Sequence, residues 1–531
     1  MTNSIGEIEG SEVILVIGSN TTEAHPQVAR RIYDAVDKGA KLIVIDPRAT
    51  KLAQHAHIHL QLWPGTDIPL INAMMRIILD ENLIDDVFIE MRTENFTELR
   101  DMLFRMDLAK ALAITGVPHD LAAAAATTYA SAHKAVLCYC LGITQHICGT
   151  DNVQTLANLA MLTGHVEQEF TGVDPLRGQN NVQGACDMGG LPGVFPGYQS
   201  VGDPIARAKF ERAWGGIMPP KPGITLMEMT HHGLELGIKG MLIMAENPML
   251  SDANIARVEK TLSGLEFLAV TEIFLTETAR MAHVVFPAAS FAEKTGTFTN
   301  TERRVQLVWK AIPPIGLCRP DSEIIAELSG RMGYEMDYES PAEIMEEIAM
   351  LVPIYGGIYH DRLEGGWGLQ WPCPDRAHQG TQYLHKYSFT RGKGHFIPAR
   401  HEPPAELPDE DYPLLLMTGR IYHHYHTGTM TRRCPTLRRE SPEALLTINP
   451  ADAKKINIRS GDMVRLFSRR GEISIRVQLN PEVRESTCYT TFHFFEAPVN
   501  LVTQDALDPI AKCPEYKVCA VRVGKIAGVN S

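Results

Sequence analysis

The amino-acid sequence predicts an α/β fold in which doubly wound, Rossmann-like domains precede a C-terminal β-barrel. Up to about residue 340, short apolar runs alternate with helical patterns, and this alternation is typical of chains that build parallel sheets. After Tyr412 the pattern changes to a series of short strands. The chain of 531 residues is also too long for one hydrophobic core, so several domains are expected.

The first strand–helix–strand unit lies near the N-terminus. Residues 12–17 (EVILVI) form an apolar run of strand length that ends at Gly18. Residues 26–38 place apolar side chains four positions apart on one helix face, with a proline at the start and Gly39 as the stop. Residues 41–45 (KLIVI) form the next strand. Two strands joined in this way predict a right-handed crossover and a parallel sheet.

The same pattern recurs and divides the chain into four segments. Further strands of the α/β region are expected at residues 135–141, 240–245, 267–271 and 284–287. Barrel strands are expected at residues 414–418, 463–468, 472–478 and 488–494, with a hairpin turn at Arg470 and Gly471. We therefore assign α/β domains to residues 1–178 and 179–340, an irregular connection rich in Gly, Pro and Trp to residues 341–410, and the barrel to residues 411–531.

Composition and charge exclude several classes of protein. The formal net charge of −13 argues against a nucleic-acid partner. No apolar run reaches the roughly 18 residues of a membrane helix, so membrane insertion is not expected. The ten cysteines form no CxxC pair, so we expect neither a cluster nor a metal ion held directly by this chain. Scattered thiols fit a reducing cytoplasm, which is the expected location.

Polar loops follow the first two strands. The loop GSNTTE lacks the glycines of the dinucleotide motif GxGxxG, yet small polar residues before a helix can bind phosphate; a structural turn is the alternative. Asp46 ends the second strand, and Asp67 follows in PGTD. Carboxylates at these places suit a ribose hydroxyl and the adjacent N–H donors of guanine, whereas turn or helix-cap roles are the alternative.

The densest run of functional residue types is GVDPLRGQNNVQGACDMGGLP at residues 172–192. Arg177 lies there between apolar and glycine neighbours, where a guanidinium could bind a small carboxylate through two parallel hydrogen bonds. Neighbouring amides, Gln179 among them, add further donors and acceptors. A salt bridge inside an interdomain loop is the alternative role of Arg177.

A cluster of His, Thr and Arg residues lies between Arg420 and Cys434. Closely spaced histidines can coordinate a metal, but a single cysteine and no acid joins them. The many hydroxyls and cations favour an anionic ligand that accepts hydrogen bonds. A solvated basic face is the third interpretation.

Together these stretches resemble one family. The arginine-containing run, with GSNTTEAHP, VIDPRAT, PGTD, YCLGITQHICG, AENPMLSD, EKTGTFTNTERRVQ, LQWPCPD, HHYHTGTMTRR and CPEYKVCAVRV, is similar to the catalytic alpha subunit of formate dehydrogenases. These subunits belong to the molybdopterin oxidoreductases that resemble DMSO reductase. The resemblance extends from residue 1 to residue 525, and the arginine-containing run is its most specific part.

The resemblance implies a bis(molybdopterin guanine dinucleotide) cofactor that carries Mo or W, and interconversion of formate and CO₂. It implies one guanine dinucleotide on each α/β domain, a double-psi barrel that binds the molybdopterin dinucleotide, and Arg177 as the catalytic residue that orients formate. The residues implied for the first nucleotide are Asn20, Glu23, Asp46, Arg48, Gly65 and Asp67. Those implied elsewhere are Gly142, Gln145, Gly178 and Gln179 near the pterins, Asn247, Ser251 and Thr271 at the second nucleotide, and Arg420, His424, Ser468 and His493 on the barrel.

The sequence also departs from the family pattern. Family members begin with a [4Fe–4S] domain followed by a selenocysteine or cysteine that ligates the metal, and this sequence contains neither motif. An N-terminal iron–sulfur segment or subunit is therefore an expected partner, with electron-transfer subunits of iron–sulfur, flavin or hydrogenase type. A reading frame that starts after an in-frame UGA codon would explain the departure, as would a split enzyme. In both cases we expect the chain alone to be inactive and poorly soluble.

Two other functions stay open from the sequence. Another molybdopterin oxidoreductase, of formylmethanofuran or nitrate type, would share the nucleotide loops. A non-catalytic scaffold subunit would share the fold without binding metal. The complete arginine-containing run favours formate as substrate, and the presence of Arg177 with the nucleotide loops argues against a scaffold.

Overall fold

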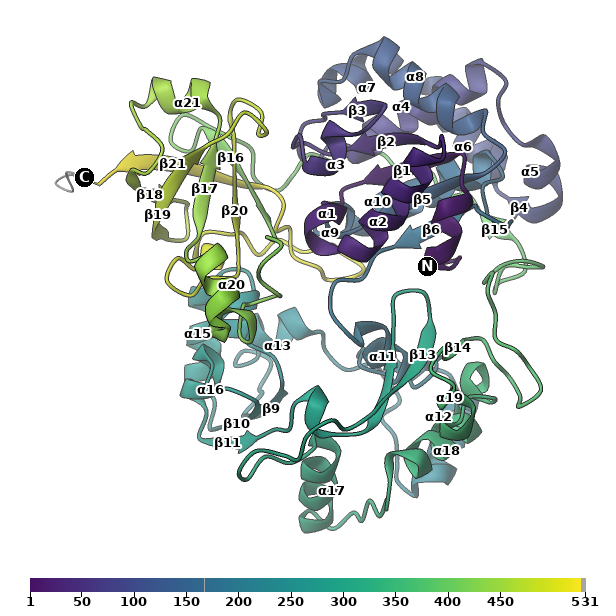
Figure 1. Cartoon of the computed structure of the whole chain (residues 1–531), viewed down its shortest axis with the longest axis vertical. Coiled ribbons are helices and arrows are strands. Elements are labelled where there is room, and N and C mark those ends of the chain that lie inside the picture. Colours follow the sequence, from purple (N-terminus) through teal and green to yellow (C-terminus); the bar gives the residue numbers. More distant parts are fainter. Residues whose placement is uncertain (167, 527–531) are drawn as a thin grey trace. The chain divides into compact units, whose positions relative to one another are not determined.

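The computed structural model describes residues 1–166 and 168–526. The chain forms two compact units (Figure 1). Unit 1 comprises Met1–Leu176, Leu250–Ala256 and Tyr383–Ser531, and unit 2 comprises Arg177–Met249 and Arg257–Gln382. These units differ from the four predicted segments, because the barrel and the first α/β region belong to the same compact unit.

Unit 1 contains a five-stranded parallel sheet in the order β3-β2-β1-β5-β6. The strands are β1 (Val13–Ile17), β2 (Lys41–Ile45), β3 (Ile58–Leu60), β5 (Ala135–Tyr139) and β6 (Gly172–Pro175). The predicted strand at residues 41–45 is confirmed at both ends. The strand predicted at residues 135–141 ends two residues early, because Leu141 already starts helix α9 (Leu141–Thr144).

Helices cover both faces of this sheet, as a doubly wound fold requires. Ile14 and Val16 of β1 point into the core formed with α2, whereas Leu15 and Ile17 point into the core formed with α4, α8 and α10. The helices of this region are η1 (Ile5–Gly10), α1 (Thr21–Ala24), α2 (Pro26–Asp37), α3 (Lys51–Gln54), α4 (Asp67–Asp80), α5 (Asp86–Arg92), α6 (Phe96–Arg105), α7 (Leu108–Thr115), α8 (His119–Ala130) and α10 (Gly149–Leu162).

Unit 2 is built around a three-stranded parallel sheet in the order β11-β10-β9. Its strands are β9 (Gly240–Met244), β10 (Phe267–Glu272) and β11 (Val284–Pro287), close to the predicted ranges. The other strands in this part of the chain are β7 (Val194–Phe195), β8 (Gln199–Ser200), β12 (Gly296–Thr299), β13 (Arg304–Val308) and β14 (Leu369–Gln370). The helices between residues 177 and 382 are α11 (Val182–Asp187), α12 (Pro204–Trp214), α13 (Leu226–His232), α14 (Pro248–Ser251), α15 (Ile255–Ser263), α16 (Glu277–Met281), η2 (Phe291–Glu293), α17 (Asp321–Arg331), α18 (Pro341–Leu351), η3 (Pro353–Tyr355) and α19 (His360–Leu363). Of these, α14 ends and α15 begins within the segment Leu250–Ala256 of unit 1.

The prediction of an irregular connection at residues 341–410 is wrong for its first part. Helix α18 begins at Pro341, and the side chain of Ser340 caps it by accepting a hydrogen bond from the backbone N–H of Glu343 at 3.4 Å. Met345 and Ala349, four residues apart, are buried on its inner face. The residues rich in Gly, Pro and Trp come after this helix, so the composition of the whole stretch concealed it.

The C-terminal strands form a closed barrel in the order β16-β20-β17-β19-β18-β21. Strands β16, β18 and β20 run in one direction, so their carboxyl ends lie at the same end of the barrel. The barrel strands are β16 (Leu414–Gly419), β17 (Leu445–Ile448), β18 (Met463–Phe467), β19 (Glu472–Leu479), β20 (Thr487–Thr491) and β21 (Cys519–Lys525). The remaining elements of unit 1 are β4 (Thr93–Glu94), which pairs with β15 (Gly394–His395), and η4 (Thr431–Arg433), α20 (Pro435–Glu440), α21 (Pro450–Lys455) and η5 (Val499–Leu501).

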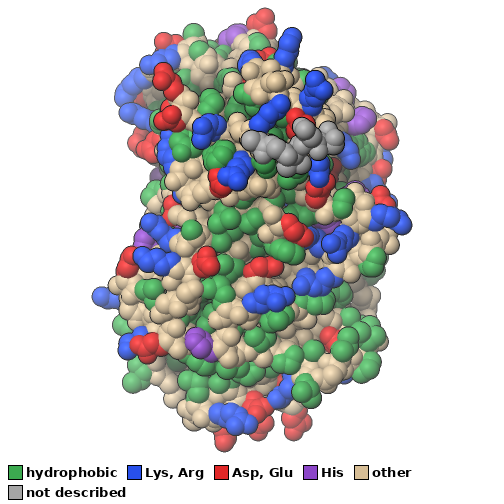
Figure 2. Space-filling model, turned by 90° about the vertical axis from the view of Figure 1, so that its left-hand side faces the viewer, with side chains coloured by type: hydrophobic (Ala, Val, Ile, Leu, Met, Phe, Trp, Pro, Cys, Tyr) green, Lys and Arg blue, Asp and Glu red, His purple; other side chains and the backbone are tan. Residues whose placement is uncertain are grey.

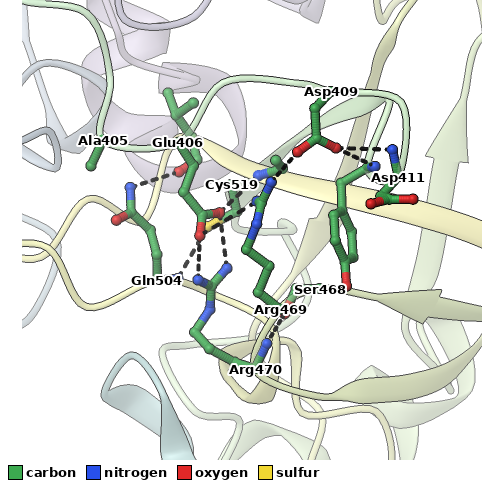
Figure 3. Close-up of polar contacts among 12 residues, drawn as sticks. Ala405, Glu406, Asp409, Asp411, Ser468, Arg469, Arg470, Gln504 and Cys519 are labelled. Carbon is green, nitrogen blue, oxygen red and sulfur yellow. Dashed lines mark hydrogen bonds and ion pairs between the residues drawn. The ribbon is translucent and has the colours of Figure 1, made fainter.

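A partly buried ion pair fastens the chain that leads into the barrel. The carboxylate of Glu406 points toward the guanidinium of Arg470 in the β18–β19 turn (Figure 3). The Nη2–Oε2 distance is 3.0 Å, and each of the two side chains is only 14% exposed. The same carboxylate accepts a hydrogen bond from the backbone N–H of Ala520 in β21. Glu406 therefore holds two barrel segments together.

We expect Glu406→Gln to destabilise the barrel by about 1–3 kcal/mol, because the variant leaves the partly buried guanidinium without its full charge partner. Hydrogen exchange of the β21 amides measures this loss. The exposed neighbour Glu410 provides the matched control, and Glu410→Gln should leave the exchange rates unchanged. Equal exchange in the two variants would contradict the role given to Glu406.

Charged side chains of both signs are mixed on the face of the molecule that Figure 2 presents. On this face, basic and acidic side chains are interspersed with hydrophobic ones, without a continuous basic stripe. Among residues 1–166 and 168–526, no helix is both long and apolar enough to span a membrane.

Candidate functional site

A pocket in unit 1 lies where the loops after β1, β2 and β5 meet the barrel. Carboxyl ends of parallel strands are the usual place for a ligand in such sheets. From the α/β region the pocket is lined by Gly18, Ser19, Asn20, Glu23, Ala24, Ile45, Asp46, Pro47, Arg48, Leu62, Pro64, Gly65, Asp67, Cys140, Leu141, Gly142 and His146. From the barrel and its adjoining loop it is lined by Met417, Thr418, Gly419, Arg420, Tyr489 and Lys517.

The base of the pocket depends on close contact between two glycines. The N–H of Gly142 donates a hydrogen bond to the carbonyl oxygen of Gly18 at 2.9 Å. A Cβ atom on Gly142 would lie 2.5 Å from that oxygen, which is closer than real Cβ atoms approach. Gly18 also has a φ of +56°, a backbone conformation that favours glycine. The loops after β1 and β5 therefore touch backbone to backbone and leave the space above them open.

Asp46 and Arg48 form one polar wall. The backbone N–H of Arg48 donates to Asp46 Oδ1 at 2.9 Å, so Asp46 fulfils the turn role considered from the sequence while it also lines the pocket. The guanidinium of Arg48 lies 3.6 Å from the ring centroid of Tyr489 and 3.5 Å from a carboxylate oxygen of Glu482. Burial raises the pKa of Asp46, and the Arg48 charge opposes this shift.

Asp67 is the second acid of the pocket and the first residue of α4. Burial raises the pKa of Asp67 to about 6, with a smaller opposing effect of His146. Such a carboxylate changes charge close to physiological pH, and ligand donors would favour its ionised form.

Three cationic side chains, Arg48, Arg420 and Lys517, also line the pocket. Lys517 is half-buried, and its Nζ donates to the carbonyl oxygen of Thr418 at 2.7 Å. Burial lowers the pKa of Lys517 to about 8, and the Arg420 charge lowers it further. Burial also lowers the pKa of Arg420. Anionic groups bound in the pocket would favour the charged forms of Lys517 and Arg420 and so oppose both decreases in pKa.

The Nε atom of Arg420 indicates whether the pocket suits a phosphorylated ligand. It is buried and has no hydrogen-bond partner within the part of the chain that the structure describes. A buried donor of this kind is costly unless a ligand satisfies it. Together with the depressed pKa of Lys517, it indicates that the pocket is built for an anion. The phosphates of a dinucleotide match this requirement.

Eight of the residues implied by the family resemblance line this pocket. They are Asn20, Glu23, Asp46, Arg48, Gly65, Asp67, Gly142 and Arg420. Two of them also hold the protein together: Asn20 precedes α1 and accepts from the Thr22 hydroxyl at 3.1 Å, and Glu23 accepts from the backbone N–H of Tyr422 at 2.6 Å.

Apart from Ser251, four implied residues of unit 1 are not among those that line the pocket. Gln145 contacts Lys517 through its backbone, because its carbonyl accepts the Lys517 N–H at 3.4 Å. Ser468 forms the β18–β19 turn, where its Oγ accepts from the N–H of Arg470 at 3.1 Å. Like Arg420, it follows a strand at the same end of the barrel. The other two are the histidines His424 and His493.

The histidines act as hydrogen-bonding groups of the barrel. His493 Nε2 accepts from the N–H of Ile421 at 3.0 Å, and its Nδ1 donates to the carbonyl of His426. Burial lowers the pKa of His493 to about 3 and that of His426 to about 4, so both rings are neutral. His424 Nε2 lies 2.7 Å from the carbonyl of Ser441. Among the described residues, no group of three or more His, Cys, Asp and Glu side chains is arranged to hold a metal ion.

The arginine-containing loop lies in unit 2, between β6 and α11, and includes Gly178 and Gln179. The N–H of Arg177 donates to the hydroxyl of Thr301 at 3.1 Å, and its Nη1 lies 3.5 Å from the sulfur of Cys186. At the other end of the loop, Asn181 Oδ1 accepts from the N–H of Thr299 at 2.9 Å. The turn after β12 therefore holds both ends of the loop that carries Arg177.

A buried carboxylate, Asp187, anchors the end of α11. It is fully buried and accepts four side-chain hydrogen bonds at 2.6–2.8 Å. The donors are Gln183, Tyr198, Tyr355 and Trp371. The hydroxyl of Tyr355 also lies 3.0 Å from that of Thr299, so this network connects α11 to the turn that holds the arginine loop.

The three residues implied for the second nucleotide are divided between the units. Asn247 and Thr271 belong to unit 2, and Ser251 belongs to unit 1. The amide of Asn247 is bonded to both Glu277 and Thr278 at the start of α16. The hydroxyl of Thr271 donates to Asp321 at 3.1 Å. The structure therefore gives structural partners to these side chains and does not test their proposed contact with a nucleotide.

Sequence reasoning missed several residues of the pocket, notably Lys517, Tyr489 and His146. Lys517 is a single cation in the otherwise ordinary segment CPEYKVC, and its importance follows from burial next to β16. His146 lies 3.5 Å from Glu515, and their side chains are 3% and 1% exposed. A buried His–Glu pair has no local sequence signature, because its partners are more than 300 residues apart.

Comparisons with known proteins agree with this architecture. The model of the molybdopterin oxidoreductase family matches residues 1–331, and that of the molydopterin dinucleotide binding domain matches residues 414–520. A solved structure, acetylene hydratase from Pelobacter acetylenicus, shares the fold with a TM-score of 0.77 at 19% identity, covering 99% of this chain and 81% of that one.

Two curated relatives are more similar in sequence. The F420-dependent formate dehydrogenase subunit alpha of Methanocaldococcus jannaschii is 49% identical, over 99% of this chain and 78% of its own length. Formate dehydrogenase H of Escherichia coli is 39% identical, over 99% of this chain and 74% of its own length. The chain is therefore a member of the molybdopterin oxidoreductase family, an oxidoreductase whose relatives are formate dehydrogenase alpha subunits.

Proposed function

We propose that this chain is the pterin-binding portion of a formate dehydrogenase alpha subunit, which interconverts formate with CO₂, a proton and two electrons. The loop that carries Arg177 is the observation that supports formate as substrate. The loop is held at both ends, by the backbone N–H of Arg177 and by the side chain of Asn181, which prepares a guanidinium for two-point binding of a small carboxylate. Relatives that match over nearly the whole chain bear the name formate dehydrogenase.

The proposed cofactor is bis(molybdopterin guanine dinucleotide) with Mo or W. When bound, this group supplies the acceptor for the two electrons. In the unit 1 pocket, Asp67 would accept the two adjacent N–H donors of guanine, and Asp46 would accept a ribose hydroxyl. Arg48, Arg420 and Lys517 would neutralise the phosphates. Gly178, Gln179, Asn247, Ser251 and Thr271 remain proposed contacts of the pterins and of the second nucleotide.

Arg177 would contribute through position and charge. Its two parallel N–H donors would fix both oxygens of formate and direct the C–H bond toward the electron acceptor. The positive charge would favour binding of formate over the neutral product CO₂. No proton transfer is assigned to Arg177, because a guanidinium stays protonated in proteins.

The proposed assembly has further components. They are an iron–sulfur segment or subunit with a [4Fe–4S] cluster, a selenocysteine or cysteine ligand of the metal, and electron-transfer subunits of iron–sulfur, flavin or hydrogenase type. We place the assembly in the cytoplasm, on the ground of the scattered free cysteines.

Cofactor analysis with a formate assay tests this proposal. The chain is produced with the remaining alpha-subunit polypeptide under anaerobic conditions, purified, and analysed for Mo, W and GMP released by acid. We expect about two GMP per metal atom and formate-dependent reduction of a viologen dye. Protein with metal but without formate oxidation would contradict the substrate. Protein without metal or GMP would contradict the cofactor and favour a scaffold.

Binding of a guanine nucleotide should depend on the protonation of Asp67. Ionised Asp67 can accept two N–H donors, whereas the protonated acid loses one acceptor site. Because the pKa of Asp67 is raised to about 6, affinity should be full above this value and fall as the pH decreases through it. We expect roughly tenfold weaker binding of GDP at pH 5 than at pH 7.5, measured by calorimetry on the purified chain.

The matched variants are Asp67→Asn and Asp37→Asn. Asp67→Asn should weaken binding at pH 7.5 and remove the pH dependence, since an amide presents only one acceptor atom. Asp37 is exposed on α2 and outside the pocket, so Asp37→Asn should behave as the natural chain does. Affinity that is equal at both pH values would refute the contact between Asp67 and guanine.

A further inference from the structure

One face of the three-stranded sheet in unit 2 is apolar and partly open. The strand register places Leu242, Ala269 and Val284 in one row across the sheet, and Met244, Thr271 and Phe286 in the next. Leu242 is 45% exposed, Met244 is 49% exposed and Phe267 is 50% exposed. Leu242 and Met244 flank the buried Ile243 in β9, and Phe267 precedes the buried Leu268 in β10, so these three side chains point away from the core. In the centre of the same face, the smaller side chains of Ala269 and Thr271 are 5% and 0% exposed.

The opposite face of the same sheet has an ordinary core. Ile243, Leu268 and Val270 are buried there against Val258 and Leu262 of α15. Figure 1 shows α15 and α16 on that side of strands β9, β10 and β11. Helices therefore cover one face of this parallel sheet. The other face meets the start of α17 at Thr271, which donates to Asp321, and carries exposed apolar side chains along β9 and at the start of β10.

This exposure is unusual for a parallel sheet. Parallel sheets occur with both faces covered, and their strands are apolar on both sides for that reason. The strands β9 and β11 follow this rule in sequence, since GMLIM and VVFP contain no charged residue. Single exposed apolar residues are common, but several that are aligned on one sheet face mark an interaction surface. The apolar strands therefore suit a sheet whose second face is packed against a further layer of polypeptide, beyond the residues that the structure describes.

The edge of the sheet supports the same conclusion. Strand β9 is the last strand in the order β11-β10-β9, and within the described parts of the chain no strand pairs with its outer edge. Natural proteins usually protect such an edge with a charge, a proline or a bulge, and β9 has none of the first two. An added strand or helix layer would cover both the edge and the apolar face.

We propose that this open face, formed by Leu242, Met244, Phe267 and Val284, is a docking surface for a further stretch of alpha-subunit polypeptide. The relatives supply the argument for this occupant. The subunit from Methanocaldococcus jannaschii matches 99% of this chain, yet the match covers 78% of that subunit's length. About a fifth of the relative is thus available as the cover. The identity of the bound polypeptide rests on the proposed function. The existence of a docking surface rests only on the exposed apolar face of strands β9, β10 and β11.

A binding experiment without cofactor or formate tests the inference. The probe is the unmatched portion of the Methanocaldococcus jannaschii alpha subunit, tagged and purified, and mixed with this chain. We expect a complex in which hydrogen exchange slows at β9 and β11. Met244→Asp, which places a charge on the open face, should weaken the complex at least tenfold. Ile205→Asp is the matched control, because Ile205 is 80% exposed on α12 in the same unit, and it should leave affinity unchanged.

The outcomes separate this inference from the proposed function. Absence of a complex, or wild-type affinity of the Met244→Asp variant, overturns the docking surface. A homodimer of this chain that Met244→Asp dissociates would assign the face to a second copy and also overturn it. An unchanged unfolding midpoint, measured by tryptophan fluorescence, verifies that the variant is folded. A complex that forms as expected but does not oxidise formate after cofactor loading would remove the proposed function and leave the docking surface intact.

Discussion

Replacing Arg177 with lysine should lower kcat/KM for formate roughly a hundredfold in the assembled enzyme. Lysine keeps the positive charge but loses the two parallel N–H donors that fix both carboxylate oxygens. Arg177→Ala should cost about ten times more, because the charge is lost as well. Steady-state kinetics with a viologen dye as electron acceptor measures both effects.

Arg207 provides the control for these variants. It lies in unit 2 on α12, where its Nε is 3.9 Å from Glu211, and it has no proposed contact with substrate. Arg207→Lys should therefore retain wild-type kcat/KM. Metal content must be equal in all preparations, so that a loss of activity reports on formate rather than on cofactor loading. Wild-type kinetics of Arg177→Lys would show that the loop does not bind the substrate.

Replacing Asp187 with asparagine should destabilise unit 2 by about 3–5 kcal/mol. The carboxylate accepts four side-chain hydrogen bonds in a fully buried site. An amide offers only one acceptor atom and turns its NH₂ group toward two donors, so at least two donors lose their partner. The variant should also loosen the turn at Thr299, which Tyr355 connects to Asp187.

Tryptophan fluorescence during urea unfolding measures this change selectively. Four of the five tryptophans, Trp214, Trp309, Trp367 and Trp371, lie in unit 2, and only Trp63 lies in unit 1. Tyr198→Phe removes one of the four donors and should cost about 1 kcal/mol. Asp337→Asn changes an exposed acid of the same unit and should have no effect. An Asp187→Asn variant as stable as the natural chain would be inconsistent with the hydrogen-bond network.

The strands of the fold could be predicted because they are short, apolar and bounded by glycine, aspartate or proline. β2 agrees with the prediction at both ends, and β11 does so as well. Helix α18 was missed because a composition window over residues 341–410 averages its helical pattern with the irregular sequence that follows. The pairing of β16 with both β20 and β21 depends on contacts between distant segments, which no local pattern contains.

The site was predictable where function coincides with a strand end. Asp46 follows β2 directly, and Gly142 follows β5, so topology alone brings them to one edge of the sheet. Lys517 was not predictable in this way, because its burial depends on how the barrel meets the α/β region. The close spacing of His424 and His426 suggested a ligand set, whereas in the structure the ring of His424 bonds to the carbonyl of Ser441 and the backbone carbonyl of His426 bonds to the ring of His493.

The pocket of unit 1 also has a consequence for the order of events during synthesis. Its walls come from residues as far apart as Gly18 and Lys517, so the ribosome must add about 500 residues between the first wall and the last. At roughly 5–20 residues per second, that interval is on the order of half a minute to two minutes. A nascent chain therefore cannot enclose a nucleotide cofactor early, and loading has to follow the translation of nearly the whole polypeptide.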